Sequence, residues 1–554
     1  MRRVVTSLSR FLLLTVALPA TAQQSGDFTY ASDGTSITIT RYTGNGGFVT
    51  IPDTIEGLPV TNIGERAFLF CPYITQLTLP DSITSIGTKA FELANLLSMT
   101  IPDTVTSIGF EAFSYCRTLG TVTIGNGVTN IGDWAFDTCT SLTNLTIGDS
   151  VTDIGEVAFY GCTGLPRVII PDSVTRVRSS AFSHCASLTT VTIGNGVTNI
   201  GGSAFSYCTS LTNIMIPSSV TGIGSSAFSH CASLINITIS KSVTSIGDEA
   251  FFWCTNLTAI EVDALNPSYS SVDGVLFNKN QTVLVTCPGG RAGDYAVPST
   301  VSSLGREAFA LCTRLTHVSI PDHVTDIGYG VFGGCYSLAN VTIPNHVTSL
   351  GESAFADCYS LTSITIPNSV TNIGPWAFQS CIGLLSLTVP DGVTGIGRGA
   401  LYRCLSLTNV VIGHGVRFID EDTFYYCTNL TGVFFTGNAP GTYPAFGGGT
   451  NTIVFYLPGT TGWGPTFGGR PTALWALPNP VVLTTAPSFG VRTNRFGFII
   501  SWATNASVVV EACTDLALPE WSPVGTNALV EGWSYFSDPE WANYANRFYR
   551  IRSP

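Results

Sequence analysis

A short pattern of apolar and polar positions recurs along most of the chain. Residues 128–139 read Val-Thr-Asn-Ile-Gly-Asp-Trp-Ala-Phe-Asp-Thr-Cys, where two variable residues separate Ile-Gly from Ala-Phe and Ala-Phe from Cys. With the Phe as marker, equivalent positions return every 23 residues, apart from one step of 22 and one gap. A fixed period of this size predicts a repeat solenoid, because a single coil cannot bury its apolar face alone. The markers are Phe68, Phe91, Phe113, Phe136, Phe159, Phe182, Phe205, Phe228, Phe251, Phe309, Phe332, Phe355, Phe378, Leu401 and Phe424.

One coil can be followed through residues 142–161. Residues 142–147 predict a strand with Leu142 inward and Thr146 outward, and residues 148–150 predict a turn. A second short extended segment follows at 151–154, Gly155 permits a change of direction, and residues 156–161 fit one helical turn. The Phe and Cys of each coil are predicted to form the interior. Representative core residues are Phe136, Cys139, Phe159, Cys162, Phe182, Cys185, Phe205, Cys208, Phe228 and Cys231.

The outward strand position is most often threonine, and we take this row as the candidate binding surface. A second threonine row, which includes Thr129 and Thr152, lies in the short extended segment. Threonine suits an exposed strand site by β propensity alone, and flat threonine rows also occur in ice-binding solenoids. Both interpretations stay open at this point. The candidate surface residues are Thr146, Thr192, Thr238, Thr342 and Thr365.

Sixteen cysteines raise the question of disulfides or metal binding. Fourteen of them stand three residues after a marker position, and no Cys-x-x-Cys pair occurs. This spacing predicts a ladder of buried thiols that act as small apolar side chains, with an occasional disulfide between neighbouring rungs as the alternative. His323 and His346 are one period apart, so a metal site of stacked histidines is a second alternative. We expect no cofactor.

The net charge and the first 22 residues indicate which partners are disfavoured and where the protein is located. Only 11% of residues are charged and the net charge is -12, which argues against nucleic acid or an anionic membrane as the partner. Residues 1–22 combine a basic start, an apolar stretch and Ala20-Thr21-Ala22, which predicts a cleaved signal peptide. The remaining chain has no apolar run long enough to span a bilayer. We therefore expect a secreted or cell-surface protein that is not integral to the membrane.

The changes in pattern predict the domain organisation. Residues 263–294 interrupt the repeats with a β-hairpin that turns at 278–281, which is either a binding insertion or a splice between repeat blocks. The last segment contains Trp502, Trp521, Trp533 and Trp541, either as core residues or as a carbohydrate platform. The predicted parts are a signal peptide at 1–22, a β-rich cap at 23–50, repeats at 51–262, the insertion at 263–294, repeats at 295–434, a second cap at 435–477, a linker at 478–483 and a small sandwich-like all-β domain at 484–554.

The repeat pattern Leu-Thr-x-Val-Thr-Ile-Pro-Asp-Ser-Val-Thr-x-Ile-Gly-x-x-Ala-Phe-x-x-Cys resembles the BspA-like leucine-rich repeat of bacterial surface proteins. The resemblance covers about residues 50–434. The coil of Phe91 lacks the Cys, Arg178 and Asp420 replace the Gly, and Leu401 replaces the Phe. The resemblance implies a leucine-rich-repeat β-solenoid, secretion, surface display, adhesion and protein–protein contact, with no shared catalytic residues.

We therefore predict an exported, monomeric scaffold for protein binding or adhesion and no enzymatic activity. One alternative is a carbohydrate-binding surface protein that uses the tryptophan-rich C-terminal domain. Another is an enzyme with its site in the insertion, which holds Asp263, Asp273 and Asp294 but no histidine. No nucleophile elbow, phosphate-binding loop or zinc-protease motif is present.

Overall fold

A computed structural model describes residues 23–448, 451–475, 481–483, 489–492, 495–501, 507–516, 520–530 and 533–552. The predicted signal peptide and Trp502 lie outside these residues. The chain divides into two compact units, which are described separately. The first comprises Met1–Cys231 and Ser245–Ala250, and the second comprises Ala232–Thr244 and Phe251–Pro554.

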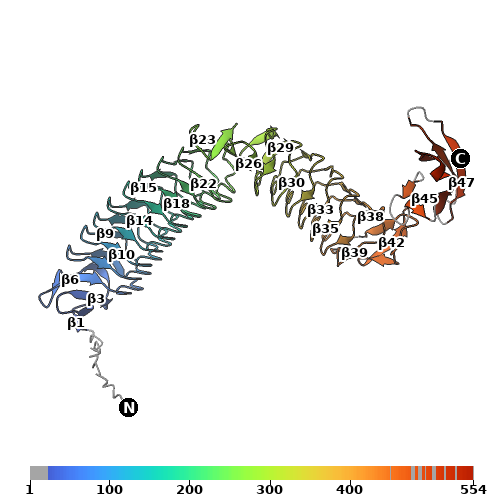
Figure 1. The fold of residues 1–554 in the computed structure, drawn as a ribbon. Helices are drawn as coiled ribbons and strands as arrows, with labels where there is room; N and C mark the ends of the chain where they lie inside the picture. Colours follow the sequence, from blue (N-terminus) through green and yellow to red (C-terminus); the bar gives the residue numbers. More distant parts are fainter. Residues whose placement is uncertain are drawn as a thin grey trace, which may run out of the picture. The chain divides into compact units, whose positions relative to one another are not determined.

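The first unit is a solenoid in which each coil adds one strand to each of two parallel β ladders (Figure 1). The main ladder holds the longer strands β7 (Ile74–Thr78), β9 (Ser98–Ile101), β11 (Thr121–Ile124), β13 (Asn144–Thr146), β15 (Arg167–Ile170), β17 (Thr190–Ile193) and β19 (Asn213–Met215). The second ladder holds β6 (Leu58–Ile63), β8 (Ser85–Ile86), β10 (Ser107–Ile108), β12 (Asn130–Ile131), β14 (Asp153–Ile154), β16 (Arg176–Val177), β18 (Asn199–Ile200), β20 (Gly222–Ile223) and β22 (Ser245–Ile246).

Antiparallel strands cover the start of this unit. β1 (Gln23–Ser25), β2 (Phe28–Ser32) and β3 (Ile37–Tyr42) form a meander, and β3 then pairs in parallel with β6. β4 (Gly47–Thr50) pairs with β7, and β5 (Thr54–Ile55) pairs with β6. The terminal coil therefore has its backbone donors and acceptors paired at the N-terminal side, as a solenoid end requires.

One interruption of the main ladder in the first unit lies where a coil begins with proline. The Thr143 amide donates to the Gly120 carbonyl oxygen at 2.9 Å, and the Thr189 amide donates to the Pro166 carbonyl oxygen at 2.9 Å. Pro166 occupies the same coil position but has no N–H to donate. As a result, β13 and β15 belong to separate sheets within the described part of the unit.

The interior of the first unit is built from stacked phenylalanines. The rings of Phe113 and Phe136 are parallel within 1° with centroids 4.9 Å apart, and Phe159 continues the stack at 5.2 Å. All three side chains are fully buried. Burial of each such side chain stabilises the fold by about 1.5–3 kcal/mol, and the gain recurs coil after coil.

The corner before each phenylalanine differs from the predicted helical turn. Residues 132–139 form consecutive turns, and Trp134 and Thr138 adopt left-handed φ angles of 61° and 56°, which a helical turn does not allow. Gly155 is required for a different reason from the one predicted, because a Cβ there would lie 2.6 Å from the backbone carbon of Gly132. The glycine therefore permits close stacking of coils, and its φ angle is unexceptional.

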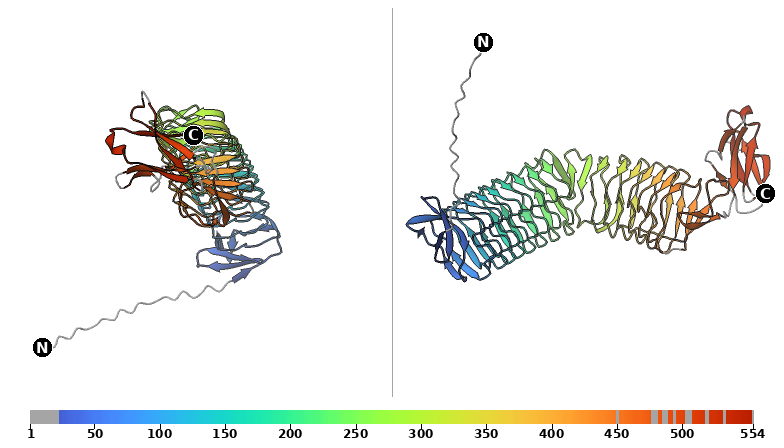
Figure 2. Two further views of the ribbon diagram at one scale, coloured as in Figure 1. Left: turned by 90° about the vertical axis from the view of Figure 1, so that its right-hand side faces the viewer. Right: turned by 90° about the horizontal axis from the view of Figure 1, so that it is seen from below.

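The second unit contains a further series of coils of the same kind (Figure 2). Its longer strands are β21 (Asn236–Ile239), β23 (Ala259–Val262), β27 (Ala292–Ala296), β29 (Arg314–Ser319), β31 (Asn340–Thr342), β34 (Ser386–Val389), β36 (Asn409–Ile412), β38 (Gly432–Phe435), β40 (Ile453–Tyr456) and β42 (Arg470–Leu474). Its short strands are β28 (Ser303–Leu304), β30 (Asp326–Ile327), β32 (Ser349–Leu350), β33 (Asn372–Ile373), β35 (Gly395–Ile396), β37 (Phe418–Ile419), β39 (Gly441–Thr442) and β41 (Thr466–Phe467).

The insertion forms part of the solenoid wall. β24 (Tyr269–Val272), β25 (Val275–Asn278) and β26 (Val283–Thr286) are antiparallel neighbours, and β26 then pairs in parallel with β28. Val275, Phe277 and Leu284 are fully buried in the same core as the later coils. The segment therefore serves as a modified coil that supports the next one.

Parallel pairing also runs through most of the predicted C-terminal cap. β40 pairs with β38, and β42 pairs with β40, so solenoid-like stacking reaches Leu474. The residues beyond it form two sheets around a core that includes Phe498, Val510 and Phe536.

One sheet contains β43 (Val481–Leu483), β44 (Phe489–Arg492), β45 (Arg495–Ser501) and β48 (Trp533–Asp538). The other sheet contains β46 (Ser507–Cys513), β47 (Ser522–Ala528) and β49 (Phe548–Arg552). A 3-10 helix spans Trp541–Asn543. β43 begins inside the segment predicted as a linker and pairs with β45.

Candidate binding surface

In the first unit, the outward face of the main ladder combines threonine with two large apolar side chains. Thr146 and Thr192 are exposed, in line with their strand position. Ile169 pairs in register with Thr192, and Met215 ends the next strand. The exposed fractions of Ile169 and Met215 are 65% and 79%. Two apolar side chains thus project into solvent from positions that other coils fill with threonine.

The second unit carries the other predicted surface threonines, Thr238, Thr342 and Thr365, all of which are exposed. Thr365 lines a cavity of about 450 Å³ on the ladder face, together with Thr388 and Val411. Residues 363–366 follow the course of a strand but are not assigned to one, so β31 and β34 lie in separate sheets. This coil has Thr362 at the position of Pro166, so a missing amide donor is not the cause of this interruption.

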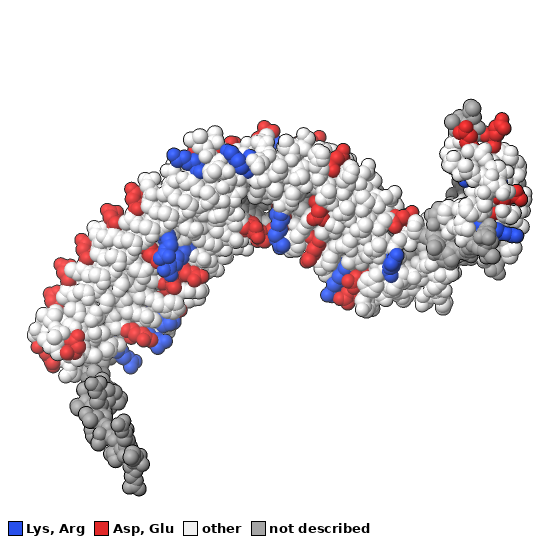
Figure 3. All heavy atoms as spheres, viewed as in Figure 1, with Lys and Arg blue, Asp and Glu red and all other residues white. Residues whose placement is uncertain are grey.

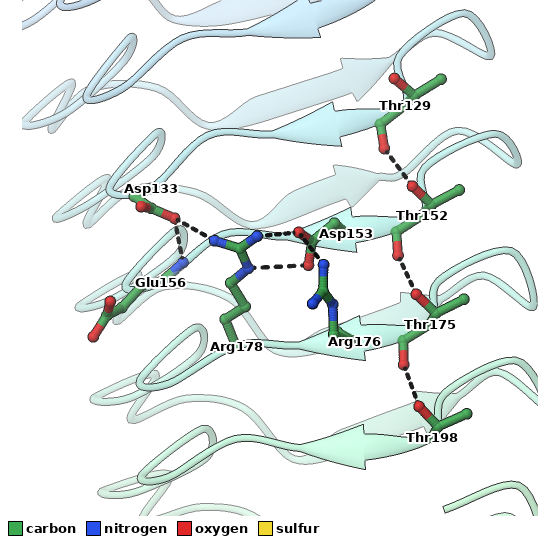
Figure 4. A network of polar contacts seen from close by, with 9 residues as sticks. All are labelled: Thr129, Asp133, Thr152, Asp153, Glu156, Thr175, Arg176, Arg178 and Thr198. Atoms are coloured by element: carbon green, nitrogen blue, oxygen red, sulfur yellow. Dashed lines mark hydrogen bonds and ion pairs between the residues drawn. The ribbon is translucent and has the colours of Figure 1, made fainter.

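The second threonine row has a structural role. The hydroxyl of Thr152 donates to the carbonyl oxygen of Thr129 at 3.1 Å, Thr175 donates to Thr152 and Thr198 donates to Thr175, both also at 3.1 Å (Figure 4). The hydroxyl hydrogens are therefore used between coils. A row whose donors are already engaged presents acceptors only, which weakens the ice-binding alternative for this row.

The surface has few charges, and one group of them gathers where the repeat departs from its pattern (Figures 3 and 4). Arg178, which replaces the corner glycine, donates to both carboxylate oxygens of Asp153, and Arg176 donates to the same carboxylate at 3.3 Å. Arg178 also lies 3.6 Å from Asp133. Asp153 is 8% exposed, so the two arginines compensate a carboxylate that is largely removed from water.

The predicted core residues are buried without exception. The five phenylalanines and five cysteines named from the sequence have no exposed surface. The Sγ atoms of Cys139 and Cys162 donate to the carbonyl oxygens of Phe113 and Phe136 at 3.2 and 3.3 Å. Burial raises the pKa of both thiols well above the usual range. These groups are therefore packed, protonated and inert.

The histidines of the first unit belong to a stack of rings. His184 and His230 flank Tyr207, with ring centroids 4.3 and 4.0 Å from it. The buried hydroxyls of Ser183 and Ser229 lie 2.9 and 2.8 Å from the Nδ1 atoms of the histidines that follow them. Partial burial lowers the pKa of both histidines. Among the described residues, no group of three or more His, Cys, Asp or Glu is placed to hold a metal ion.

The acidic residues of the insertion make local contacts. Asp263 accepts a hydrogen bond from the Leu265 amide at 2.9 Å, and Asp294 accepts one from the Thr316 hydroxyl at 2.8 Å. Asp273 has a left-handed φ of 50° at a turn. The hydrogen bonds of Asp263 and Asp294 thus stabilise a turn and a neighbouring strand.

Comparison with known sequences and structures shows to which protein family the chain belongs. The family model described as "BspA type Leucine rich repeat region" matches residues 48–166, 130–258, 175–282 and 296–438, in six copies. The chain belongs to the BspA-type leucine-rich repeat family. A leucine-rich cell surface protein from Faecalibacterium prausnitzii has 34% sequence identity to this chain. Its crystal structure matches with a TM-score of 0.52, and the match covers 71% of this chain and 94% of that one.

A second solved structure gives a weaker match. A leucine-rich repeat protein from Bacteroides ovatus is 25% identical with a TM-score of 0.47, covering 74% of this chain and 93% of that one. No curated protein matches the sequence significantly. In the part of this BspA-type chain that the structure describes, no helix has the length and apolar character needed to cross a bilayer.

Sequence reasoning overlooked the most distinctive positions of this BspA-type surface. Ile169 and Met215 could have been found, because they interrupt the outward threonine row. The different environments of the C-terminal tryptophans could not have been found from the sequence. Trp533 is 40% exposed, Trp521 lies under the Arg550 guanidinium at 4.5 Å, and Trp541 lines a cavity. Their different environments depend on strand pairing within the C-terminal module, which has no repeat to guide prediction.

Proposed function

We propose that this protein is a secreted or cell-surface scaffold that binds another protein through the outward face of the main ladder in its first unit. The observation that carries the proposal is the exposure of Ile169 and Met215 in a row that is otherwise threonine. Protein interfaces concentrate binding energy in a few apolar or arginine side chains surrounded by polar groups. Arg167, exposed on the same strand as Ile169, adds such a group.

The arrangement of the coil supports a binding role. Phenylalanine, cysteine and glycine positions are fixed by stacking, so substitutions there cost stability, whereas the outward position can vary freely. Methionine is unbranched and adaptable, which suits a contact surface. The family and the cell-surface protein from Faecalibacterium prausnitzii support a location outside the cell, as do the residues that predict a signal peptide.

The test replaces Ile169 and Met215 with threonine, the residue that most coils carry at this outward position. A photoreactive amino acid at position 169, with the same group at Thr152 beside the second ladder as control, should capture the partner selectively in the protein's native environment. Binding of that partner to the double variant I169T/M215T, measured by surface plasmon resonance, should weaken at least about tenfold.

A matched control distinguishes the loss of this surface from the loss of any exposed apolar side chain. Leu97 is 52% exposed and lies at the coil position where Thr143 stands two coils later. The L97T variant removes a comparable apolar side chain away from the outward row and should bind normally. Equal affinity of wild-type protein and I169T/M215T for the captured partner would overturn the proposal.

A further inference from the structure

The C-terminal module contains a cavity of about 330 Å³ lined mainly by aromatic rings. Phe496 from β45 stacks on Tyr549 from β49 with ring centroids 5.2 Å apart, and the Trp541 ring is tilted against that of Phe496 with centroids 6.4 Å apart. Tyr544 and Asn546 contribute to the wall and are exposed. The volume is at the lower end of the range of small-molecule sites, which fits one ring of a larger ligand.

A buried charge pair holds the wall of this cavity in place. The Arg547 Nε donates to Asp538 Oδ2 at 2.6 Å, the Tyr549 hydroxyl donates to the same oxygen at 2.9 Å, and the Glu540 amide donates to Asp538 Oδ1 at 2.8 Å. Asp538 is 3% exposed. The Arg547 guanidinium also lies 4.1 Å from the centre of the Tyr544 ring. Two cavity-lining side chains are thus fixed by contacts that do not require a ligand.

The chemistry of the cavity favours a neutral ligand. The positive charge of Arg547 is compensated by Asp538, so the wall has no net charge to attract an anion or a cation. What remains is aromatic surface and the Asn546 amide, which makes no hydrogen bond to the described part of the chain. An amide offers both donors and an acceptor.

A neutral sugar ring combines the two properties that this wall can meet. One face of a pyranose carries C–H groups that pack on aromatic rings, and its rim carries hydroxyls that both donate and accept hydrogen bonds. We propose that the cavity formed by Phe496, Trp541, Tyr544, Asn546 and Tyr549 binds a neutral pyranose unit of a polysaccharide. This site is separate from the protein-binding face proposed for the first unit.

The test uses the chain without its predicted signal peptide, residues 23–554, and titration calorimetry with cellohexaose, xylohexaose, mannohexaose and hexa-N-acetylchitohexaose as probes. At least one probe should bind in the low-millimolar range or tighter. W541A and N546A should each weaken that binding at least about tenfold. N546A removes an exposed polar group, so it tests the site without disturbing the core. W533A removes a tryptophan that does not line the cavity and should bind like the wild type.

Other outcomes separate this proposal from its competitors. The I169T/M215T variant should bind the sugar normally, so failure of the protein-binding proposal would leave this result intact. Absence of binding by all four probes would overturn the sugar proposal, as would equal weakening by W533A and W541A. Thermal unfolding of each variant, followed by near-ultraviolet circular dichroism, shows whether the module remains folded.

Discussion

The Sγ of Cys139 donates to the carbonyl oxygen of Phe113 across 3.2 Å and so joins one coil to the coil before it. Equivalent contacts recur along both units, for example from Cys335 to Phe309 at 3.0 Å. The thiol fills the space behind the phenylalanine stack and supplies a weak donor to a carbonyl that would otherwise lie in an apolar interior. The cysteine ladder is therefore part of the packing between coils.

Thiol reactivity should follow this placement. Of the sixteen cysteines, Cys71 is partly exposed and the others are buried. In native protein, iodoacetamide should modify Cys71 and leave the ladder unmodified, because alkylation needs an accessible thiolate. Peptide mass spectrometry after labelling checks this, and labelling in guanidinium, where all sixteen should react, is the control. Rapid native modification of Cys139 would contradict the buried ladder.

Stability should fall at alkaline pH. Burial raises the pKa of Cys139 and Cys162 far above the unfolded value of about 8.5, and raises that of Cys116 to about 12. Above pH of about 8.5 the unfolded chain releases thiol protons that the folded chain retains, so unfolding becomes easier by about 1 kcal/mol per pH unit for each buried thiol. The stabilisation is complete below that pH and disappears as pH rises through the folded pKa values.

The matched variant for this pH effect is C139A/C162A. Its stability should be lower at neutral pH because two small cavities are created, but its loss of stability between pH 8.5 and 10.5 should be shallower than that of the wild type by about 2 kcal/mol per pH unit. Denaturant titrations at several pH values give these slopes. Parallel pH profiles for the two proteins would show that the ladder thiols do not control alkaline unfolding.

Replacement of one stacked phenylalanine should destabilise its neighbourhood. Phe205 is fully buried with its ring 5.6 Å from that of Phe182. F205A should cost about 3–5 kcal/mol, whereas F205L should cost much less, since Leu401 occupies the equivalent position naturally with 1% exposure. Hydrogen exchange should show the loss in adjacent coils and little change at distant ones, because repeats interact with their neighbours. A uniform loss of protection would contradict this nearest-neighbour account.

Most of the coil could be predicted from the sequence because one physical requirement is repeated many times. Phe136 and Cys139 recur at fixed offsets, so their burial follows from the period alone. The corner could not be predicted fully, since Trp134 and Thr138 take left-handed angles that their residue types do not signal. The local sequence predicts a change of direction at Gly155, whereas the structure requires glycine there because the adjacent coil lies too close for a Cβ.

The candidate surfaces were less predictable for a related reason. The exposure of Thr146 followed from its alternation with inward residues. The structure adds that the Thr152 hydroxyl is engaged between coils, which depends on a spacing of backbones that no local pattern specifies. The aromatic cavity at Trp541 depends on side chains from β45 and β49, more than 40 residues apart, in a module without repeats.

The charge cluster at Asp153 should tolerate loss of one arginine but not of both. R178G restores the usual residue of the repeat and leaves Arg176 beside the carboxylate, and because the side chain of Arg178 is 42% exposed, the expected loss is within about 1 kcal/mol. R176T/R178G leaves Asp153, which is 8% exposed, without either partner and should cost about 1–3 kcal/mol. Adding D153T to the double variant removes the uncompensated carboxylate and should recover most of that loss. Denaturant unfolding of the three variants measures the series; equal stability of the double and triple variants would show that Asp153 does not need its arginines.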